Sequence, residues 1–149
     1  MSLVEKLEKS FKEALKNREE LKVSTFRMAK AALKNKQKDL MRDLVEEEVT
    51  AILRTLIKQR YEAKELFQKG GREDLSQKEA EEIAILSALL PPLLSQEELH
   101  HLLEKTIADL NPTGPRDMGR VMKEMMGTVA GRANGKQVSE LVKAKLAAL

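Results

Sequence analysis

The sequence contains no cysteine among its 149 residues. Disulfide bonds and thiolate metal sites are therefore excluded, and the composition is compatible with a reducing cytosol without proving it. Aromatic residues make up only 3% of the chain, and they are Phe11, Phe26, Tyr61 and Phe67. All four lie on or near apolar positions of expected helices, so we expect no aromatic platform on which bases of single-stranded RNA could stack.

Long uncharged runs are also missing. The longest covers residues 83–96, is interrupted by Pro91-Pro92 and is too short to span a bilayer. The first residues hold no apolar run of signal-peptide length. We therefore expect no membrane partner and a cytoplasmic protein.

The common signatures of catalysis and metal binding do not occur: there is no Gly-rich phosphate loop, zinc signature or nucleophile elbow. His100 and His101 are adjacent and would point about 100° apart on a helix, which makes a poor metal pair. The glutamates at 46–48 and at 79, 81 and 82 are interpreted as first-turn and solvent-facing charge. We predict no catalytic residue, no metal site and no cofactor.

Helix-forming residues dominate what is present, because alanine, leucine, glutamate and lysine are abundant and β-formers are scarce. Apolar residues recur at helical spacing and predict helices over about 3–17, 21–40 and 44–69, and from about 75 to Pro91. Ser2 with Glu5 and Ser76 with Glu79 fit capping boxes, and Asp43 is the expected cap of the third helix. Gly70-Gly71 is expected to end that helix.

Pro91-Pro92 must end the fourth helix and is the best domain boundary. Ser95 with Glu98 then predicts another helix to about 110, and further helices begin near Asp117 and before Val138. The run 127–135 is expected to be a flexible connection. The predicted fold is all-α, with an N-terminal antiparallel four-helix region (1–92) joined to a small C-terminal three-helix domain (93–149).

Two features near the C-terminus have competing explanations. The helical spacing of Met118, Met122 and Met125 favours a core stripe over a soft partner groove. Gly119 would cost up to about 1 kcal/mol relative to alanine in a helix. Its preferred explanation is close packing against a neighbouring helix, and the alternative is close approach of a phosphate backbone.

Charge is unevenly distributed along the chain. Residues 1–45 carry net charge +5, residues 46–109 carry −6, and residues 110–149 carry +4. On a helix, Arg116, Arg120 and Lys123 would share one face. Such a face could neutralise phosphates, or it could simply be solvated. The candidate RNA-binding residues are six of the seven basic residues of the last third, namely Arg116, Arg120, Lys123, Arg132, Lys136 and Lys143.

The order and spacing of several short motifs resemble the YqeY family, and through it the tail domain of the B subunit of the glutamine-dependent tRNA amidotransferase. The motifs are residues 26–28, 32–35, 89–91, 117–122, 131–135 and 138–142. Asn134 stands where the family often has aspartate, and Arg120 where it often has lysine. The resemblance implies an all-helical tRNA-handling module. It implies no carbon–nitrogen ligase catalysis by this chain.

Two functional hypotheses follow. In the first, the chain is an accessory protein that grips tRNA through its basic C-terminal domain, helped by Lys30, Lys34 and Lys38. In the second, the long N-terminal helices dock a protein partner, such as a subunit of the amidotransferase or a tRNA synthetase. The oligomeric state is left open. An enzyme is the weakest of the three functional classes considered, because no nucleophile, base and orienting group form a set.

Overall fold

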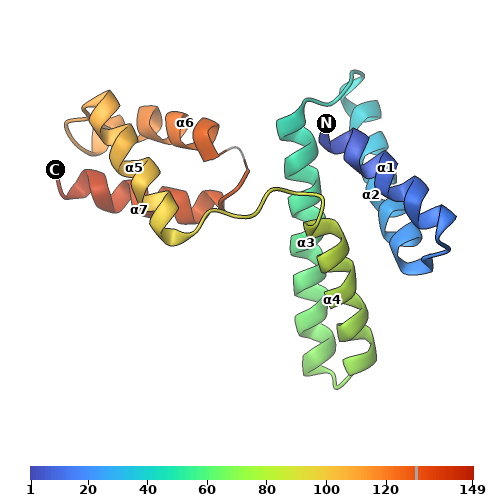
Figure 1. Cartoon of the computed structure of the whole chain (residues 1–149). Helices are drawn as coiled ribbons and strands as arrows, with labels where there is room; N and C mark the ends of the chain where they lie inside the picture. The colour runs from blue at the N-terminus through green and yellow to red at the C-terminus, as the bar shows by residue number, and fades with distance from the viewer. Residues whose placement is uncertain (130) are drawn as a thin grey trace. The chain divides into compact units, whose positions relative to one another are not determined.

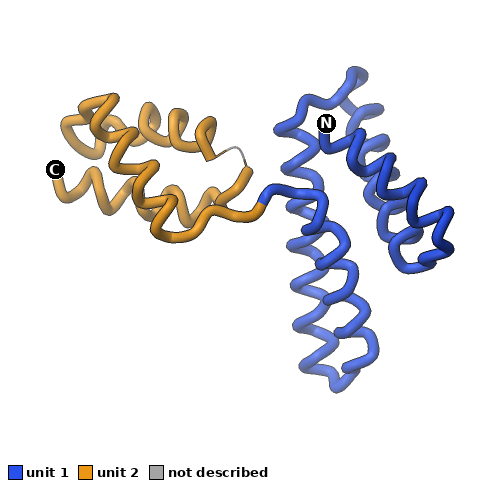
Figure 2. The backbone as a smooth tube through the Cα atoms, in the orientation of Figure 1, with its two compact units in different colours: residues 1–91 blue, residues 92–149 orange. Residues whose placement is uncertain are grey.

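A computed structural model describes residues 1–129 and 131–149, and every regular element within them is helical, which confirms the all-α prediction. The chain divides into two compact units, Met1–Pro91 and Pro92–Leu149 (Figure 2). The helices of unit 1 are α1 (Leu3–Lys16), α2 (Glu20–Leu40), α3 (Glu46–Lys69) and α4 (Glu73–Ser87) (Figure 1). Those of unit 2 are α5 (Gln96–Leu110), the 3-10 turn η1 (Pro115–Asp117), α6 (Met118–Val129) and α7 (Gly135–Ala147).

Unit 1 consists of two helical hairpins that share one aliphatic core. The hairpin of α3 and α4 is the more extensively packed, and the two helices lie side by side along most of α4 (Figure 1). Leu7 from α1, Leu53 from α3 and Leu86 from α4 are at most 1% exposed. The apolar spacing of the sequence therefore places one stripe of each helix inward.

The start of α1 is capped twice. The Ser2 hydroxyl accepts a hydrogen bond from the Glu5 N–H at 3.2 Å, as the capping-box pattern predicts. The Leu3 N–H donates to the Glu46 carboxylate at 2.7 Å, although the two residues are 43 positions apart. Amides of a helix start need such acceptors, so this bond holds the start of α1 against the start of α3.

Asp43 is not the cap of α3, contrary to the sequence prediction. Val45 occupies the N-cap position, and its N–H donates at 3.0 Å to Glu48, which reaches back from the first turn. Asp43 instead accepts a hydrogen bond from the Gln37 side chain at 2.6 Å. The Glu48 carboxylate also pairs with Arg42 at 2.8 Å, which stabilises it in this position.

Ser76 is not a cap either, because α4 begins three residues earlier, at Glu73. Gly70 ends α3 as predicted, and Gly71 takes a left-handed conformation with φ of 74°. Glycine adopts this φ at no steric cost, so the chain reverses within a few residues and the next helix starts at once. Ser76 then lies inside the helix and is 2% exposed.

A buried charged cluster joins α3 to α4. Arg60 is 8% exposed and donates to Glu82 at 3.1 Å and to the Leu56 carbonyl at 3.0 Å. Burial raises the pKa of the neighbouring Glu79, and the charge of Glu82 adds to this effect. One guanidinium thus faces two carboxyl groups, and one oxygen of Glu79 has no hydrogen-bond partner.

Unit 2 has its own core of aliphatic residues and one methionine. Ser95 caps α5 as predicted, accepting from the Glu98 N–H at 3.1 Å. Helices α5, α6 and α7 each pack against the other two. Met125 is fully buried and Met118 and Met122 are partly buried against the same core, which confirms the core-stripe interpretation of these three methionines, whereas Met126 is 39% exposed. The core residues at most 3% exposed are Leu99, Leu103, Val121, Met125, Val129, Val138, Val142 and Leu146.

The predicted flexible run 127–135 is only partly a loop: residues 127–129 belong to α6 and Gly135 begins α7, whereas residues 131–134 form the connection. Helix α6 continues through Gly127 and ends at Val129, which is fully buried. Burial of Val129 outweighs the helix-breaking tendency of Gly127. The connection to α7 is therefore short; Ala130 lies outside the described residues, and Asn134 caps α7 by accepting from the Lys136 N–H at 2.7 Å.

Both prolines at the boundary between the two units accept a hydrogen bond through their carbonyl groups. The carbonyl of Pro91 accepts a hydrogen bond from the Arg54 guanidinium at 3.1 Å, within unit 1. The carbonyl of Pro92 accepts one from the Arg132 guanidinium at 3.0 Å, within unit 2. Each proline is thus held by the unit to which it belongs.

Replacing Arg42 with alanine should raise the pKa of Glu48 from about 2 toward its ordinary value of 4.5, because the guanidinium hydrogen bond is the largest cause of the lowering. A carboxyl group with a lowered folded-state pKa stabilises the fold above its ordinary pKa. That contribution is lost as the pH falls from about 4.5 to about 2. Carbon-13 NMR titration of the Glu48 carboxyl group measures the shift. Lys38→Ala is the control, and an unchanged pKa in Arg42→Ala would contradict the assignment.

Met125→Ala should lower the free energy of unfolding of unit 2 by about 2–5 kcal/mol, because it leaves a cavity in a packed core. Met126→Ala, the matched control on the same helix, should change it by less than about 0.5 kcal/mol. The single tyrosine, Tyr61, lies in unit 1. Urea unfolding should therefore be followed by the NMR signals of Val142, and equal effects of the two substitutions would contradict the packing.

Candidate nucleic-acid interface

The orientation of α6 is set by what it buries. Val121, Met125 and Val129 recur every four residues and are fully buried. At about 100° per residue, Arg120 and Lys123 then lie on the opposite, outward side of the helix. Both are exposed, so the structure places them on one solvent-facing surface as the spacing predicts. We call the surface formed by Gly119, Arg120, Lys123 and Gly127 the α6 face.

Arg116 lies just before this helix, in the 3-10 turn η1, and is exposed. The predicted α-helical spacing therefore does not apply to it. The turn is held by Asp117, whose carboxylate accepts from the Thr113 N–H at 2.7 Å and from the Thr113 hydroxyl at 3.2 Å. The backbone bond from Thr113 is the largest cause that lowers the pKa of Asp117, so this carboxylate stays charged.

Carboxylates neutralise little of this positive charge. Arg120 forms an ion pair with Asp117 at 3.5 Å, and its side chain is 52% exposed. Such an exposed pair is worth between about 0 and 1 kcal/mol. Among the described residues, none of the other five candidates forms a salt bridge; these are Arg116, Lys123, Arg132, Lys136 and Lys143.

Gly119 does not serve helix packing, contrary to the preferred explanation from the sequence. A Cβ added at Gly119 or at Gly127 would meet no atom within 4 Å outside the helix's own backbone and the chain neighbours. Gly127 follows Arg120 by seven residues and so lies within about 20° of it around the helix axis. Two glycines thus expose the backbone of α6 beside its cations, at a cost of up to about 1 kcal/mol each.

Lys136 and Lys143 form a second basic surface on α7. They are seven residues apart, exposed, and directed away from the buried Val138 and Val142. Helices α6 and α7 enclose the same core, so their outward faces diverge from each other. The structure therefore brings the candidate cations onto two surfaces of unit 2 and not onto one.

Arg132 has a structural role within unit 2. Its side chain donates through Nε to the Pro92 carbonyl at 3.0 Å, and its own carbonyl accepts from the Leu94 N–H at 2.8 Å. The residue is partly buried. Both partners lie about 40 positions earlier in the chain, so no local sequence pattern could have revealed this role.

One aromatic residue departs from the prediction. Phe26 is buried, and Arg27 and Lys30 lie 5.8 and 4.3 Å from the centroid of the Phe11 ring. Tyr61 on α3, in contrast, is 51% exposed, so the aromatic ring is accessible in unit 1. The expectation that all four aromatic residues lie on or near apolar helical faces and are not accessible therefore does not hold for Tyr61.

The other candidates in unit 1 differ in their surroundings. Lys30 pairs with Glu8 at 3.0 Å, whereas Lys34 and Lys38 are exposed and form no salt bridge among the described residues. His100 and His101 are both exposed. The described part of the chain contains no group of three or more metal-ligating side chains, and no helix in it is long and apolar enough to cross a membrane.

Four relatives were found that are each named "Altered inheritance of mitochondria protein 41, mitochondrial", and three of them are described by their identity and coverage. The protein of Vanderwaltozyma polyspora is 33% identical over 70% of this chain and 58% of its own length. The protein of Kluyveromyces lactis is 34% identical over 73% of this chain and 60% of its own length. The protein of Pyrenophora tritici-repentis is 25% identical over 94% of this chain and 81% of its own length. This chain thus spans about three fifths of the two yeast proteins. Their names place those proteins in mitochondria, so a cytoplasmic location of this chain stays a prediction.

A family model agrees with the sequence resemblance and covers nearly all of both units. The model of the Yqey-like protein family matches residues 4–146. The matched segment includes every described helix except the first residue of α1 and the last of α7. The chain therefore belongs to the YqeY family.

Proposed function

We propose that the protein binds tRNA through the α6 face, and that it acts as an accessory factor without catalytic residues of its own. The observation that supports this most is the combination on one helix side of two exposed cations with two glycines that expose the backbone. Cations neutralise phosphates, and a bare helix backbone lets a sugar-phosphate strand approach closely. Arg116, in the turn just before α6, would extend the contact.

The mode of binding follows from what surrounds the face. Unit 2 contains no phenylalanine, tyrosine or tryptophan, and its two histidines, His100 and His101, lie on α5, so the α6 face itself has no aromatic ring on which a base could stack. Recognition would rest on the shape and backbone of a folded RNA, as is usual for duplex RNA. The resemblance to the amidotransferase tail supports tRNA as this folded RNA.

The α7 surface of Lys136 and Lys143 would take a secondary part. It diverges from the α6 face, so a single short duplex would not cover both surfaces without bending around the unit. Arg132 would contribute indirectly, by holding residues 92–94 in place. A subunit of the amidotransferase or of a tRNA synthetase remains the alternative partner, for the N-terminal unit.

The double substitution Arg120→Ala/Lys123→Ala should weaken tRNA binding about tenfold, because two phosphate contacts are lost. The slope of log affinity against log salt should fall by about 2, at roughly one unit per cation. Fluorescence anisotropy of labelled tRNA between about 50 and 200 mM salt measures both quantities.

The matched control is Lys58→Ala/Lys69→Ala, which removes the same charge from exposed positions of α3. Lys136→Ala/Lys143→Ala reports separately on α7. Circular dichroism should show unchanged helical content in each variant. Absence of tRNA binding by the intact chain at about 50 mM salt would end the proposal, and so would an equal loss in the α3 control.

Gly119→Ala and Gly127→Ala should have opposite effects on stability and on binding. Each should raise the free energy of unfolding by up to about 1 kcal/mol, because alanine favours helix and the added Cβ meets nothing. Each should weaken tRNA binding, because the methyl group would separate the helix backbone from the phosphates. Gly114→Ala, in the loop before η1, is the control and should leave the affinity unchanged. Unchanged affinity in all three variants would place the RNA elsewhere.

A further inference from the structure

Unit 1 contains two hollows that join into one groove over the first half of α2. The first has a volume of about 400 Å³ and is lined by α1, the turn after it, α2 and the end of α4. The second, of about 460 Å³, is lined by the start of α2 and by α4. Both hollows include Glu19, Lys22, Ala84 and Ile85, so they are continuous.

The packing of the helices explains why the groove exists. Helix α2 packs against both α1 and α4, whereas α1 and α4 do not pack closely against each other in the described part of the chain. The groove therefore has α2 as its floor and α1 and α4 as its walls, and we call it the α1/α4 groove. A further helix laid over α2 would fill the space between the two walls.

The α1/α4 groove offers apolar surface. Phe26 and Leu89 line it from below and are 4% and 5% exposed. Ala84 and Ala88 lie four residues apart on α4 and are both exposed, so this wall carries small side chains. Helix axes pack about 8–10 Å apart according to the side chains at the contact, and small ones allow the closer approach.

The lining of the α1/α4 groove is acidic. It holds one ammonium group, that of Lys22, and four carboxylates, which belong to Glu13, Glu19, Glu20 and Glu81. Lys22 pairs with Glu19 at 3.4 Å, and the other three carboxylates form no salt bridge among the described residues. The lining thus has an excess of three negative charges.

Other cations on the same elements do not cancel this excess within the groove. The side of α1 that lines it consists of residues at spacings of three and four, namely Ser10, Glu13 and Asn17. Lys12 and Lys16 lie about 90° or more around the helix from the middle of that side, and they line neither hollow. Arg18 and Lys78 line neither hollow either. Helix ends add little, because the ends of α1 and α4 contribute partial negative charge and the start of α2 partial positive charge.

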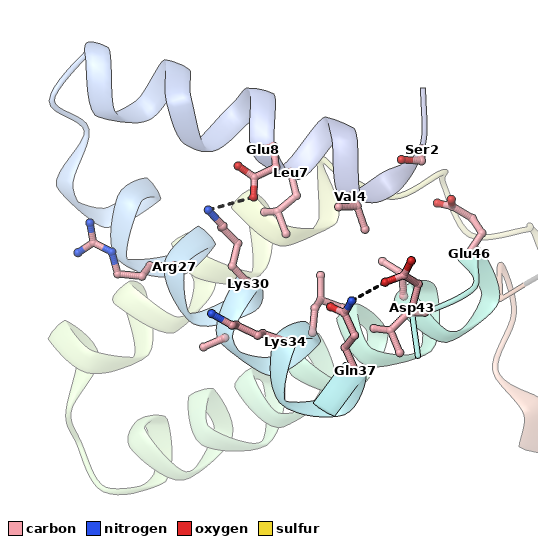
Figure 3. Close-up of a pocket in the computed structure, with 14 residues that line it drawn as sticks. Ser2, Val4, Leu7, Glu8, Arg27, Lys30, Lys34, Gln37, Asp43 and Glu46 are labelled. Carbon is pink, nitrogen blue, oxygen red and sulfur yellow. Dashed lines mark hydrogen bonds and ion pairs between the residues drawn. The ribbon is translucent and has the colours of Figure 1, made fainter. Parts of the chain in front are cut away.

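A larger groove in unit 1 lacks this imbalance. It has a volume of about 660 Å³ and lies between α1, α2 and the start of α3 (Figure 3). Three acidic and three basic residues line it, and these are Glu8, Asp43, Glu46, Arg27, Lys30 and Lys34. Its charges balance, so they favour no partner of either sign.

We propose that the α1/α4 groove binds a basic amphipathic helix of a partner protein. The apolar side of that helix would cover Ile85 and the two exposed alanines, and its lysine or arginine side chains would meet carboxylates of both walls. The apolar side supplies contact area, and the complementary charge selects the partner. A polyamine has the charge without the apolar side, and the acidic lining would repel RNA. The site is independent of the RNA binding proposed for unit 2.

The test uses the full chain and three fluorescently labelled, alanine-based helical peptides of about 16 residues, or about 24 Å. The first carries leucines along one side with lysines flanking them. The second has glutamates in place of the lysines, and the third keeps the lysines but has glutamines in place of the leucines. Fluorescence anisotropy should show that the first peptide binds at least tenfold more tightly than either of the others.

Glu13→Lys/Glu81→Lys reverses one charge on each wall. It should weaken binding of the first peptide at least tenfold and should make the glutamate peptide the better ligand. The control is Glu62→Lys/Glu65→Lys, which makes the same charge change at exposed positions of α3 outside both hollows, and it should keep the preference for the lysine peptide. Circular dichroism of each variant checks that the helices persist, and the reversed preference requires a folded groove.

Four results would each overturn the proposal. They are no binding of the first peptide at about 1 mM; equal loss of affinity in the control variant; equal affinity for the leucine and glutamine peptides with displacement of both by spermine, which would assign the groove to a small cation; and a dimer of the intact chain, in sedimentation velocity, that Glu13→Lys/Glu81→Lys dissociates, which would make a second copy the occupant.

Discussion

The rotational setting of each helix about its own axis is the constraint on which both candidate surfaces depend. Helix α6 cannot turn without exposing Val121, Met125 and Val129, and α2 cannot turn without exposing Phe26, Ala29 and Leu33. Burying a side chain of this size is worth about 1.5–3 kcal/mol. The same aliphatic stripes therefore direct Arg120 and Lys123 outward from one unit and place Arg27 and Lys34 on an exposed side of α2 in the other.

Periodicity in the sequence was sufficient to predict the helices, because each apolar stripe is regular and ends at a proline, a glycine or a short polar segment. The errors concern helix ends. Asp43 and Ser76 satisfy the local rules for capping, but Glu46 and Glu48 supply acceptors to the starts of α1 and α3, and Gly71 lets α4 begin early. Competition among several nearby acceptors depends on the three-dimensional fold, which a local pattern does not contain. We did not predict that α6 continues to Val129, because Gly127 was interpreted as the end of the helix and the burial of Val129 cannot be seen in the sequence.

The candidate interface was predictable in composition and only partly in geometry. Spacing within α6 correctly placed Arg120 and Lys123 on one side. The role of Arg132 could not be predicted, because its partners are far away in the chain. The divergence of the α6 and α7 surfaces follows from three helices enclosing one core. The open space at Gly119 and the α1/α4 groove of unit 1 likewise depend on neighbours from several segments, which sequence spacing does not identify.

The hydrogen bonds that anchor Pro91 and Pro92 have a consequence for any ligand that binds both units. With the carbonyl of Pro91 anchored to Arg54 and that of Pro92 anchored to Arg132, the tether between the two anchored groups is a single residue step of about 3.8 Å. A short tether keeps the second binding event at high effective concentration once the first has occurred. A single ligand that reaches a site on each unit at once would therefore gain avidity from the proline joint itself, without any new contact.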